Sequence, residues 1–276
     1  MEYFNKLFFL DIKILCMLLA LIFCSTMAIS AEEKPSSTIG PEFVILLHGM
    51  ARSERSMRPL ENRLTKNGFS VINTGYPSTT ETVEIIADKY LGAMVDQCLQ
   101  KGSFEDKYLW GTVDQRLQKS SVKIHIVTHS LGAIVVRQYL QNHTLPTGSR
   151  IVMIAPPNKG SELADKLGSF RIYQWLNGPA GQELGTGPDS LPNTLKPVKG
   201  EVGVIAGNAT WNPLFSWLIP GDDDGKVSIR NTKLNEMTDF IVIFSSHPFI
   251  MRNAAVMEQV VYFLRNGKFD HRAGKS

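Results

Sequence analysis

The chain has 276 residues, enough for one large domain or two small ones, and a single α/β domain of this length is ordinary. Hydrophobic residues make up 43% of the sequence and charged residues 20%, as in a soluble protein with a large buried core. The formal net charge is +3, and the basic residues are dispersed along the sequence. Nucleic-acid binding needs a concentrated basic face, so we expect no nucleic-acid partner.

The N-terminus differs in composition from the rest of the chain. An unbroken apolar run at 14–24 follows two lysines and precedes a stretch of small residues. The run is shorter than the roughly 20 apolar residues of a membrane-spanning helix and has the length of a signal-peptide core. We therefore predict that residues 1–31 are a signal peptide and that the protein is exported, to the periplasm or beyond it. Glu2 and Asp11 weaken the positive N-terminal region, so an uncleaved anchor that holds the protein at the membrane stays an alternative.

A linker and one large domain are predicted after this segment. Residues 32–41 are polar and contain two prolines, which is typical of a linker, and residues 42–276 are expected to form a single domain. Removal of residues 1–31 leaves Cys98 as the only cysteine, so the mature domain cannot form an internal disulfide. Cys98 lies in a helical pattern and is expected to act as a small buried hydrophobe.

From residue 42 onward, apolar strands alternate with amphipathic helices. The predicted elements in chain order are strand 43–47, helix 53–67, strand 69–73, helix 81–99, strand 122–128, helix 131–141, strands 150–155, 201–206 and 240–244, and helix 249–264. Strands that are apolar almost throughout are typical of a parallel sheet covered on both faces. We therefore predict an α/β protein with a mostly parallel central sheet and helices on both faces.

Three stretches interrupt the alternation, at 100–120, 157–198 and 211–220. We interpret them as small cap insertions over a site; loops that are simply pinned to the body are the alternative. The third stretch gathers large apolar side chains, among them Trp211 and Phe215, outside any strand. These two residues are candidates for lining a substrate-binding site, unless they seal the body of the protein against its last helix.

The strongest local signal is the segment 126–132, IVTHSLG, between a predicted strand and a predicted helix. A serine on such a sharp turn exposes its hydroxyl above the sheet, and the N–H of the next residue, Leu131, faces the charge that develops on an attacked carbonyl. Ser130 is therefore the candidate nucleophile, with a helix-cap role as the alternative. Thr128 replaces the first glycine of the usual Gly-x-Ser-x-Gly elbow, and Gly132 supplies the second.

A second signal is the segment 44–50, VILLHGM, a strand that ends in His-Gly. Gly49 lets the backbone turn, so that the N–H of Met50 can point at the same oxyanion as the N–H of Leu131. Met50 and Leu131 are the predicted oxyanion hole. His48 is expected to fix this loop, and proton transfer by His48 is the alternative.

Three consecutive aspartates follow the strand at 201–206. A histidine that acts as general base is oriented by an ionised carboxylate that accepts its ring N–H. Asp224 begins a D-G-x-V pattern and is the candidate for this role, while Asp222 and Asp223 are expected to be solvated or to hold the loop. Calcium binding by the three aspartates is the alternative; our prediction includes no metal.

His247 stands between the last predicted strand and the last predicted helix. This position is at the carboxyl end of a parallel sheet, where a base for Ser130 has to lie. His247 is therefore the candidate general base.

These segments resemble the lipase and esterase branch of the α/β-hydrolases, in particular bacterial triacylglycerol-lipase-like proteins. The resemblance covers almost all of the chain after residue 31 and includes HGMARS at 48–53, THSLG at 128–132, GDDDGKV at 221–227 and HPFIMRN at 247–253. The order serine, aspartate, histidine is also that of α/β-hydrolases. The resemblance implies an α/β-hydrolase fold with a triad of Ser130, Asp224 and His247, and an oxyanion hole at Met50 and Leu131.

We therefore predict a serine esterase or lipase that cleaves carboxylic esters with an apolar acyl chain through an acyl-enzyme. The prediction includes no cofactor, and it includes transient contact with membrane lipid. An acyltransferase that uses the same triad is one alternative, since both reactions need the same nucleophile. The other alternative is a non-catalytic, envelope-associated binding protein, against which the three intact residues argue.

Overall fold

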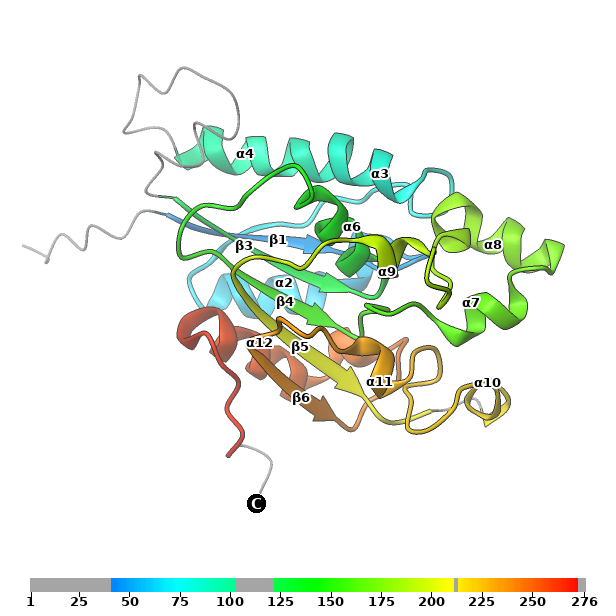
Figure 1. The fold of residues 1–276 in the computed structure, drawn as a ribbon. Coiled ribbons are helices and arrows are strands. Elements are labelled where there is room, and N and C mark those ends of the chain that lie inside the picture. The colour runs from blue at the N-terminus through cyan, green and yellow to red at the C-terminus, as the bar shows by residue number, and fades with distance from the viewer. Residues whose placement is uncertain (1–40, 103–121, 211–212, 273–276) are drawn as a thin grey trace, which may run out of the picture. The chain divides into compact units, whose positions relative to one another are not determined.

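A parallel sheet forms the centre of the protein. The computed structural model describes residues 41–102, 122–210 and 213–272, with the backbone alone at 213–215. In these residues six strands are joined in the order β2-β1-β3-β4-β5-β6, and every neighbouring pair is parallel (Figure 1). The strands are β1 (Glu42–Leu47), β2 (Ser70–Ile72), β3 (Lys123–His129), β4 (Arg150–Ile154), β5 (Glu201–Gly207) and β6 (Asp239–Ile243). The predicted parallel sheet is confirmed.

Alternate side chains of β1 pack on opposite faces of the sheet, because successive residues of a strand point to opposite sides. Phe43, Ile45 and Leu47 share one buried cluster with helices α3, α4 and α6, whereas Val44 and Leu46 share another with helices α2 and α12. The bounds of these helices are α2 (Arg58–Lys66), α3 (Val83–Ile85), α4 (Gly92–Gly102), α6 (Leu131–Tyr139) and α12 (Ala254–Asn266), and the π-helical turn η2 (Ile86–Leu91) joins α3 to α4. Helices therefore cover both faces of the sheet, as predicted.

Two helices predicted as continuous are interrupted near their start. The predicted helix 53–67 is a 3-10 turn, η1 (Glu54–Ser56), followed by α2, in which Pro59 occupies one of the first two positions. Proline has no N–H to give to a preceding turn and is favoured where a helix begins. The predicted helix 249–264 is the turn η3 (Ile250–Arg252) followed by α12, because Asn253 is extended and its side chain caps the N–H groups of Ala255 and Val256.

The insertion at 157–198 contains three helices, α7 (Glu162–Leu167), α8 (Arg171–Gln182) and α9 (Leu191–Thr194). Two more short helices, α10 (Pro213–Leu218) and α11 (Ile229–Thr232), lie between β5 and β6. In Figure 1, α7, α8 and α10 lie beyond the carboxyl ends of the strands. The insertions therefore add helices at the end of the sheet where the sequence predicts a site.

Several predictions fall outside the described residues. They concern the signal segment 1–31, the linker up to residue 40, and residues 103–120 of the predicted insertion at 100–120. Export, membrane anchoring and the division into a linker and one domain therefore stay predictions. Within the described ranges, no helix combines the length and the apolar character needed to cross a membrane.

The connections of β1 and β3 determine where a site can form. These two strands are neighbours, with Leu47 opposite Thr128 at their carboxyl ends. The chain then leaves β1 toward α2 on one face of the sheet and leaves β3 toward α6 on the other. Connections that diverge in this way open a crevice at the carboxyl ends of the two strands, which is where ligands bind in open α/β sheets.

Candidate active site

Ser130 lies at the turn from β3 into α6, in a conformation that few residues other than glycine adopt. Its φ is 52° and its ψ is −118°, and its N–H donates to the carbonyl of Ile154 at 2.9 Å. The other positive-φ residues that are not glycine in the described chain are Ala51 and Ala155, which follow the carboxyl ends of β1 and β4. Backbone strain of this kind costs about 1–3 kcal/mol per residue and gathers at functional sites.

Gly132 allows the turn at Ser130 to pack against β1. A Cβ at this position would lie 2.8 Å from the Cβ of Leu47 and 2.8 Å from its carbonyl oxygen, both closer than a side chain tolerates. Thr128, where the usual elbow has a glycine, is fully buried in β3. The close approach of α6 to β1 therefore requires a small residue at 132, whereas position 128 accommodates a side chain.

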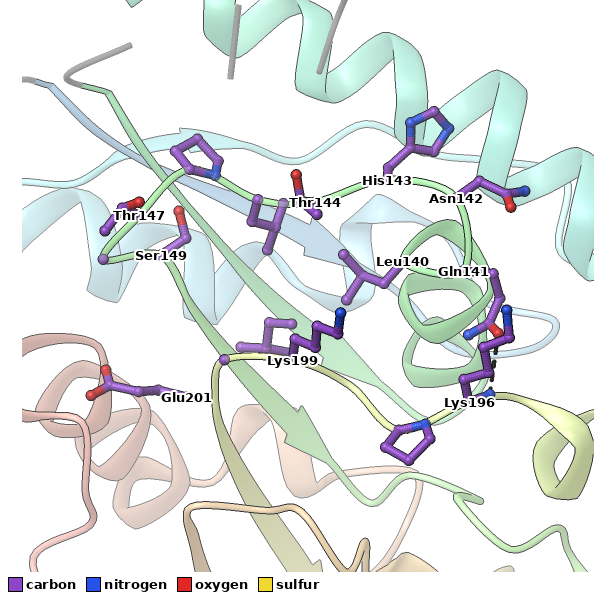
Figure 2. Close-up of a pocket in the computed structure, with 16 residues that line it drawn as sticks. Leu140, Gln141, Asn142, His143, Thr144, Thr147, Ser149, Lys196, Lys199 and Glu201 are labelled. Atoms are coloured by element: carbon purple, nitrogen blue, oxygen red, sulfur yellow. Dashed lines mark hydrogen bonds between the residues drawn. The ribbon is translucent and has the colours of Figure 1, made fainter. Parts of the chain in front are cut away.

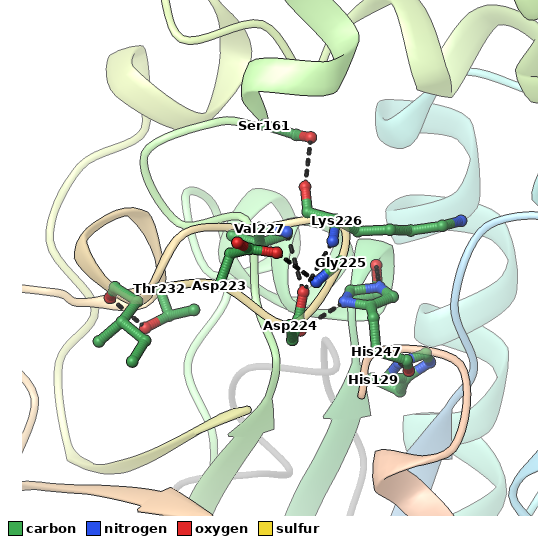
Figure 3. Close-up of polar contacts among 11 residues, drawn as sticks. His129, Ser161, Asp223, Asp224, Gly225, Lys226, Val227, Thr232 and His247 are labelled. Atoms are coloured by element: carbon green, nitrogen blue, oxygen red, sulfur yellow. Dashed lines mark hydrogen bonds and ion pairs between the residues drawn. The ribbon is translucent and has the colours of Figure 1, made fainter. Parts of the chain in front are cut away.

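His247 joins Ser130 to Asp224 through two hydrogen bonds. Its Nε2 lies 3.0 Å from Ser130 Oγ and its Nδ1 lies 2.7 Å from Asp224 Oδ2. Asp224 and His247 are buried, and Ser130 is half-buried. The structure thus brings the three predicted residues together, although 94 and 23 positions separate them along the chain (130 to 224 and 224 to 247). Figure 3 shows Asp224, in the segment between β5 and β6, beside His247, which follows β6.

The loop around Asp224 holds its carboxylate with backbone donors. Asp224 Oδ1 accepts the N–H of Lys226 at 3.0 Å and the N–H of Val227 at 2.9 Å, while Oδ2 faces the histidine ring (Figure 3). Asp223 points elsewhere: its carboxylate accepts the Ser216 hydroxyl and the N–H of Gly225. Asp222 is exposed. Of the three aspartates, only Asp224 contacts the histidine.

The loop after β1 lies against Ser130. A Cβ on Gly49 would lie 3.2 Å from the Cβ of Ser130, so the following residue, Met50, begins beside the serine. The N–H of Ala51 donates to Ser78 Oγ at 3.1 Å, which fixes the loop past this point. Leu131 is the first residue of α6, where a helix offers its N–H no acceptor, and no described residue is found to accept the N–H of Met50.

His48 is bound within its own loop. Its Nδ1 lies 2.9 Å from the carbonyl oxygen of Gly49, and its Nε2 accepts the N–H of Tyr76 at 3.3 Å. The two rings are stacked at 4.0 Å between centroids, and the Tyr76 hydroxyl donates to the His48 carbonyl. Burial lowers the pKa of His48. Both ring nitrogens are therefore used to hold the loop, in agreement with the expected role of this residue.

Comparison with known proteins gives the fold. No protein-family model and no curated protein matches the sequence. Among solved structures, the mature form of the lipase BlEst2 from Bacillus licheniformis matches with a TM-score of 0.59 and 18% identity, over 84% of this chain and 94% of that one. Phospholipase PlaB from Legionella pneumophila, in complex with thio-NAD, matches with a TM-score of 0.55 and 19% identity, over 81% of this chain and 58% of that one. The chain has the α/β-hydrolase fold.

The insertion at 157–198 and helix α10 leave apolar side chains exposed at the carboxyl end of the sheet. They lie on α8 and just before it, and on α10: Phe170, Ile172, Trp175, Leu176 and Trp217, with Trp175 80% and Trp217 82% exposed. The insertion is tied to the acid loop, since Ser161 Oγ donates to the carbonyl of Lys226 at 2.9 Å. Trp211 and the side chain of Phe215 lie outside the described residues, so their assignment to an acyl-chain site stays a prediction.

His129 is a further residue of the site, to which the sequence assigned no role. Its ring is buried 5.0 Å from the ring of His247, and its Nε2 lies 3.1 Å from the His247 carbonyl oxygen. Burial, followed by the nearby His247, holds the pKa of His129 well below its ordinary range, so Nε2–H donates from a neutral ring. A Cβ on Gly49 would lie only 2.7 Å from Nδ1 of His129. The one signal in the sequence was the position of His129 directly before Ser130.

A separate hollow of about 570 Å³ lies at the opposite, amino end of β4 and β5. Residues 140–149, 151, 196–197 and 199–201 line it, and its polar side chains include His143 and Lys199 (Figure 2). It contains none of the predicted site residues. The chemistry expected from the sequence therefore belongs to the other end of the sheet.

Proposed function

We propose that this α/β-hydrolase is a serine hydrolase that cleaves carboxylic esters through an acyl-enzyme on Ser130. The observation that carries the proposal is the pair of hydrogen bonds from Ser130 to His247 and from His247 to Asp224, at 3.0 and 2.7 Å. A nucleophile bonded to a base that a third group orients is the arrangement of acyl-transfer enzymes. The lipase structures with the same fold support the proposal.

In the first half of the reaction, Ser130 Oγ attacks the ester carbonyl while His247 Nε2 takes its proton. The carbonyl π bond breaks, and its electron pair becomes the oxyanion. The proposed donors to that oxyanion are the N–H of Leu131, in the first turn of α6, and the N–H of Met50, in the loop beside it. The tetrahedral intermediate then expels the alcohol, which leaves with the proton from His247, and the acyl group stays on Ser130.

In the second half, water repeats the same steps. His247 takes a proton from the water as it attacks the acyl carbonyl, and it returns the proton to Ser130 Oγ when the acid leaves. Asp224 holds the imidazole ring by its Nδ1–H in both halves. An alcohol in place of water gives acyl transfer, so measuring product partitioning with added alcohol separates the esterase from an acyltransferase.

The proposed substrate has an apolar acyl chain and is met at a lipid surface. The support is the set of exposed apolar side chains on α8 and α10, at the same end of the sheet as Ser130. Tryptophan favours membrane–water interfaces, and Trp175 and Trp217 are the most exposed of the set. A panel of chromogenic esters of increasing chain length tests the acyl preference, and vesicle sedimentation tests the lipid contact.

Export is also proposed, on the basis of the sequence of residues 1–31 alone. Cell fractionation followed by N-terminal sequencing tests it. A mature protein outside the cytoplasm that begins near residue 32 supports a cleaved signal peptide. A membrane-bound protein that retains residues 1–31 supports the anchor instead.

The decisive experiment on function compares the wild type with Ser130→Ala. Alanine keeps a Cβ at the same backbone conformation, so we expect an unchanged melting temperature together with loss of ester turnover and of labelling by a fluorophosphonate probe. Ser246→Ala is the matched control, because Ser246 lies directly before His247 and its side chain takes no part in the proposed reaction. Labelling and turnover that survive in folded Ser130→Ala would reject Ser130 as the nucleophile.

A further inference from the structure

Two basic residues border the proposed active site without taking part in its chemistry. Arg52 lies in the loop after β1, where its N–H donates to the carbonyl of Gly49 at 3.3 Å. That glycine is packed against Ser130, since a Cβ on it would lie 3.2 Å from the Cβ of the serine. The Arg52 side chain is exposed. The loop that supplies one proposed oxyanion donor therefore also carries a cation at its surface.

Lys226 approaches the same place from the acid loop. Its backbone N–H donates to Asp224 at 3.0 Å, and its carbonyl accepts the Ser161 hydroxyl, so both sides of its peptide unit are fixed. In Figure 3 its side chain extends from this loop toward the side of His247. The side chain remains accessible to solvent. The two cations thus come from the loop that packs against Ser130 and from the loop that holds Asp224.

The two cations also affect the pKa values of groups at the site. Desolvation, followed by the positive charge of Arg52, lowers the pKa of Lys226, and the negative charge of Asp224 opposes this effect. The positive charges of Arg52 and Lys226 also contribute to lowering the pKa of His129, the residue before Ser130. Two like charges close together are unfavourable unless an anion lies between them.

Three carboxylates on the same loops have partners of their own. Asp224 is bound to His247 and to two backbone N–H groups. Asp223 accepts the Ser216 hydroxyl and a backbone N–H, and Glu54 faces Arg55 at 3.9 Å. Among the ion pairs of the described residues, none includes Arg52 or Lys226.

We infer that Arg52 and Lys226 form an anion-binding subsite beside Ser130, and that the preferred ester carries a phosphate or carboxylate group in addition to the bond that is cleaved. This inference rests on the proposed function and specifies its substrate class. Phosphate and carboxylate oxygens are the partners that guanidinium and ammonium groups select, and the two loops hold their cations at fixed backbone positions. An anionic ester gains from both cations, whereas a neutral ester of the same length gains from neither.

Two matched pairs of substrates test the inference. The first pair is the para-nitrophenyl monoester of adipic acid, whose acyl chain ends in a carboxylate, and para-nitrophenyl hexanoate, which has the same number of acyl carbons and no charge. The second pair is a monoacylglycerol phosphate and the monoacylglycerol with the same acyl chain. The measured quantity is the ratio of kcat/KM for the charged ester to kcat/KM for the neutral one. A preference in the first pair alone indicates a carboxylate on the acyl side, and a preference in the second pair alone indicates a phosphate on the alcohol side.

The variants are Arg52→Gln, Lys226→Gln and the double variant. We expect the ratio to exceed one in the wild type and to fall about fivefold for each cation removed, the effect of unit charges about 4 Å apart in water. Added salt should lower the ratio of the wild type in the same direction. Lys199→Gln, which removes an exposed lysine at the opposite end of the sheet, is the charge-matched control and should leave the ratio unchanged. Lys226→Arg should retain it.

A ratio near one in the wild type for both pairs, or a ratio that the folded double variant retains, overturns the subsite while ester hydrolysis stands. If the proposed function itself is wrong, the protein turns over no ester and is not labelled by the fluorophosphonate probe. In that case inorganic phosphate serves as the probe. A rise in melting temperature with phosphate that the double variant loses supports the subsite, and an equal response in both proteins rejects it.

Discussion

Replacing Gly132 by alanine adds a methyl group at the closest contact between α6 and β1. The new Cβ would lie 2.8 Å from the Cβ of Leu47 and 2.8 Å from its carbonyl oxygen. Carbon atoms normally approach to about 3.5–4.0 Å, so the two elements must separate by several tenths of an ångström or more. Leu47 ends β1 directly before the loop of Met50, and Gly132 follows Leu131. The separation therefore moves the two proposed oxyanion donors apart.

The expected magnitude has a stability part and an activity part. Overpacking costs about 1–3 kcal/mol, from which up to about 1 kcal/mol is regained because alanine favours a helix over glycine. For a domain of this size each 1 kcal/mol corresponds to roughly 2–4 °C in melting temperature, so we expect a decrease of several degrees. Misplacing catalytic groups by about 1 Å can cost on the order of a hundredfold in rate, and we expect a tenfold to hundredfold loss of kcat/KM.

Thermal unfolding followed by circular dichroism and steady-state ester hydrolysis measure the two parts. Gly92→Ala is the matched control, because Gly92 also begins a helical segment but the nearest atom to its added Cβ would be 4.0 Å away. That variant should be as stable as the wild type or slightly more stable, with unchanged activity. If Gly132→Ala behaved like Gly92→Ala in both measurements, the tight approach of α6 to β1 would not be what positions the site.

Two further predictions concern the acid loop and the core. Asp224→Asn should lower kcat on the order of a thousandfold or more, since an amide cannot accept the imidazole N–H and both backbone N–H groups as the carboxylate does. Asp222→Asn should have little effect on kcat, and Asp223→Asn should have an intermediate effect because Asp223 holds the loop. Equal losses of kcat in all three variants would refute the assignment of Asp224. Burial lowers the pKa of His125 to about 4, below its unfolded value of about 6.5, so the stability it contributes is present above about pH 6.5 and is lost as the pH falls toward 4, by roughly 3 kcal/mol. Urea unfolding at about pH 7 and about pH 4.5 should show a smaller pH difference for His125→Gln than for the wild type, and an equal difference would contradict this cause.

The class of fold was predictable from the sequence because parallel strands that are buried on both faces are apolar at nearly every position. Val44 and Leu46 face one layer of helices while Phe43, Ile45 and Leu47 face the other, so β1 has to be apolar at consecutive positions. The elbow at Ser130 was predictable for a related reason. A strand followed at once by a helix leaves room for only one sharp turn, and Gly132 marks the point where the two elements touch.

The helix boundaries were predicted less well, because local backbone geometry overrides the apolar period there. By the spacing of apolar residues, Asn253 belongs to the last helix. Its side chain instead caps the following N–H groups, so that α12 begins at Ala254. The apolar pattern records which face is buried and carries little information on where the first turn begins.

For the site, the sequence alone determined which residue types occur at strand ends and in which order. Ser130, Asp224 and His247 each follow a predicted strand, and parallel strands bring such positions to one edge of the sheet. Only the tertiary structure decided which of the three aspartates faces the histidine, because adjacent residues of a loop point in different directions and hydrogen bonds across the loop select between them. It alone also brought the ring of His129 to the carbonyl of His247, and the loop of Arg52 against Ser130. Such proximities arise from packing between segments about a hundred residues apart, and the sequence has no local pattern that records them.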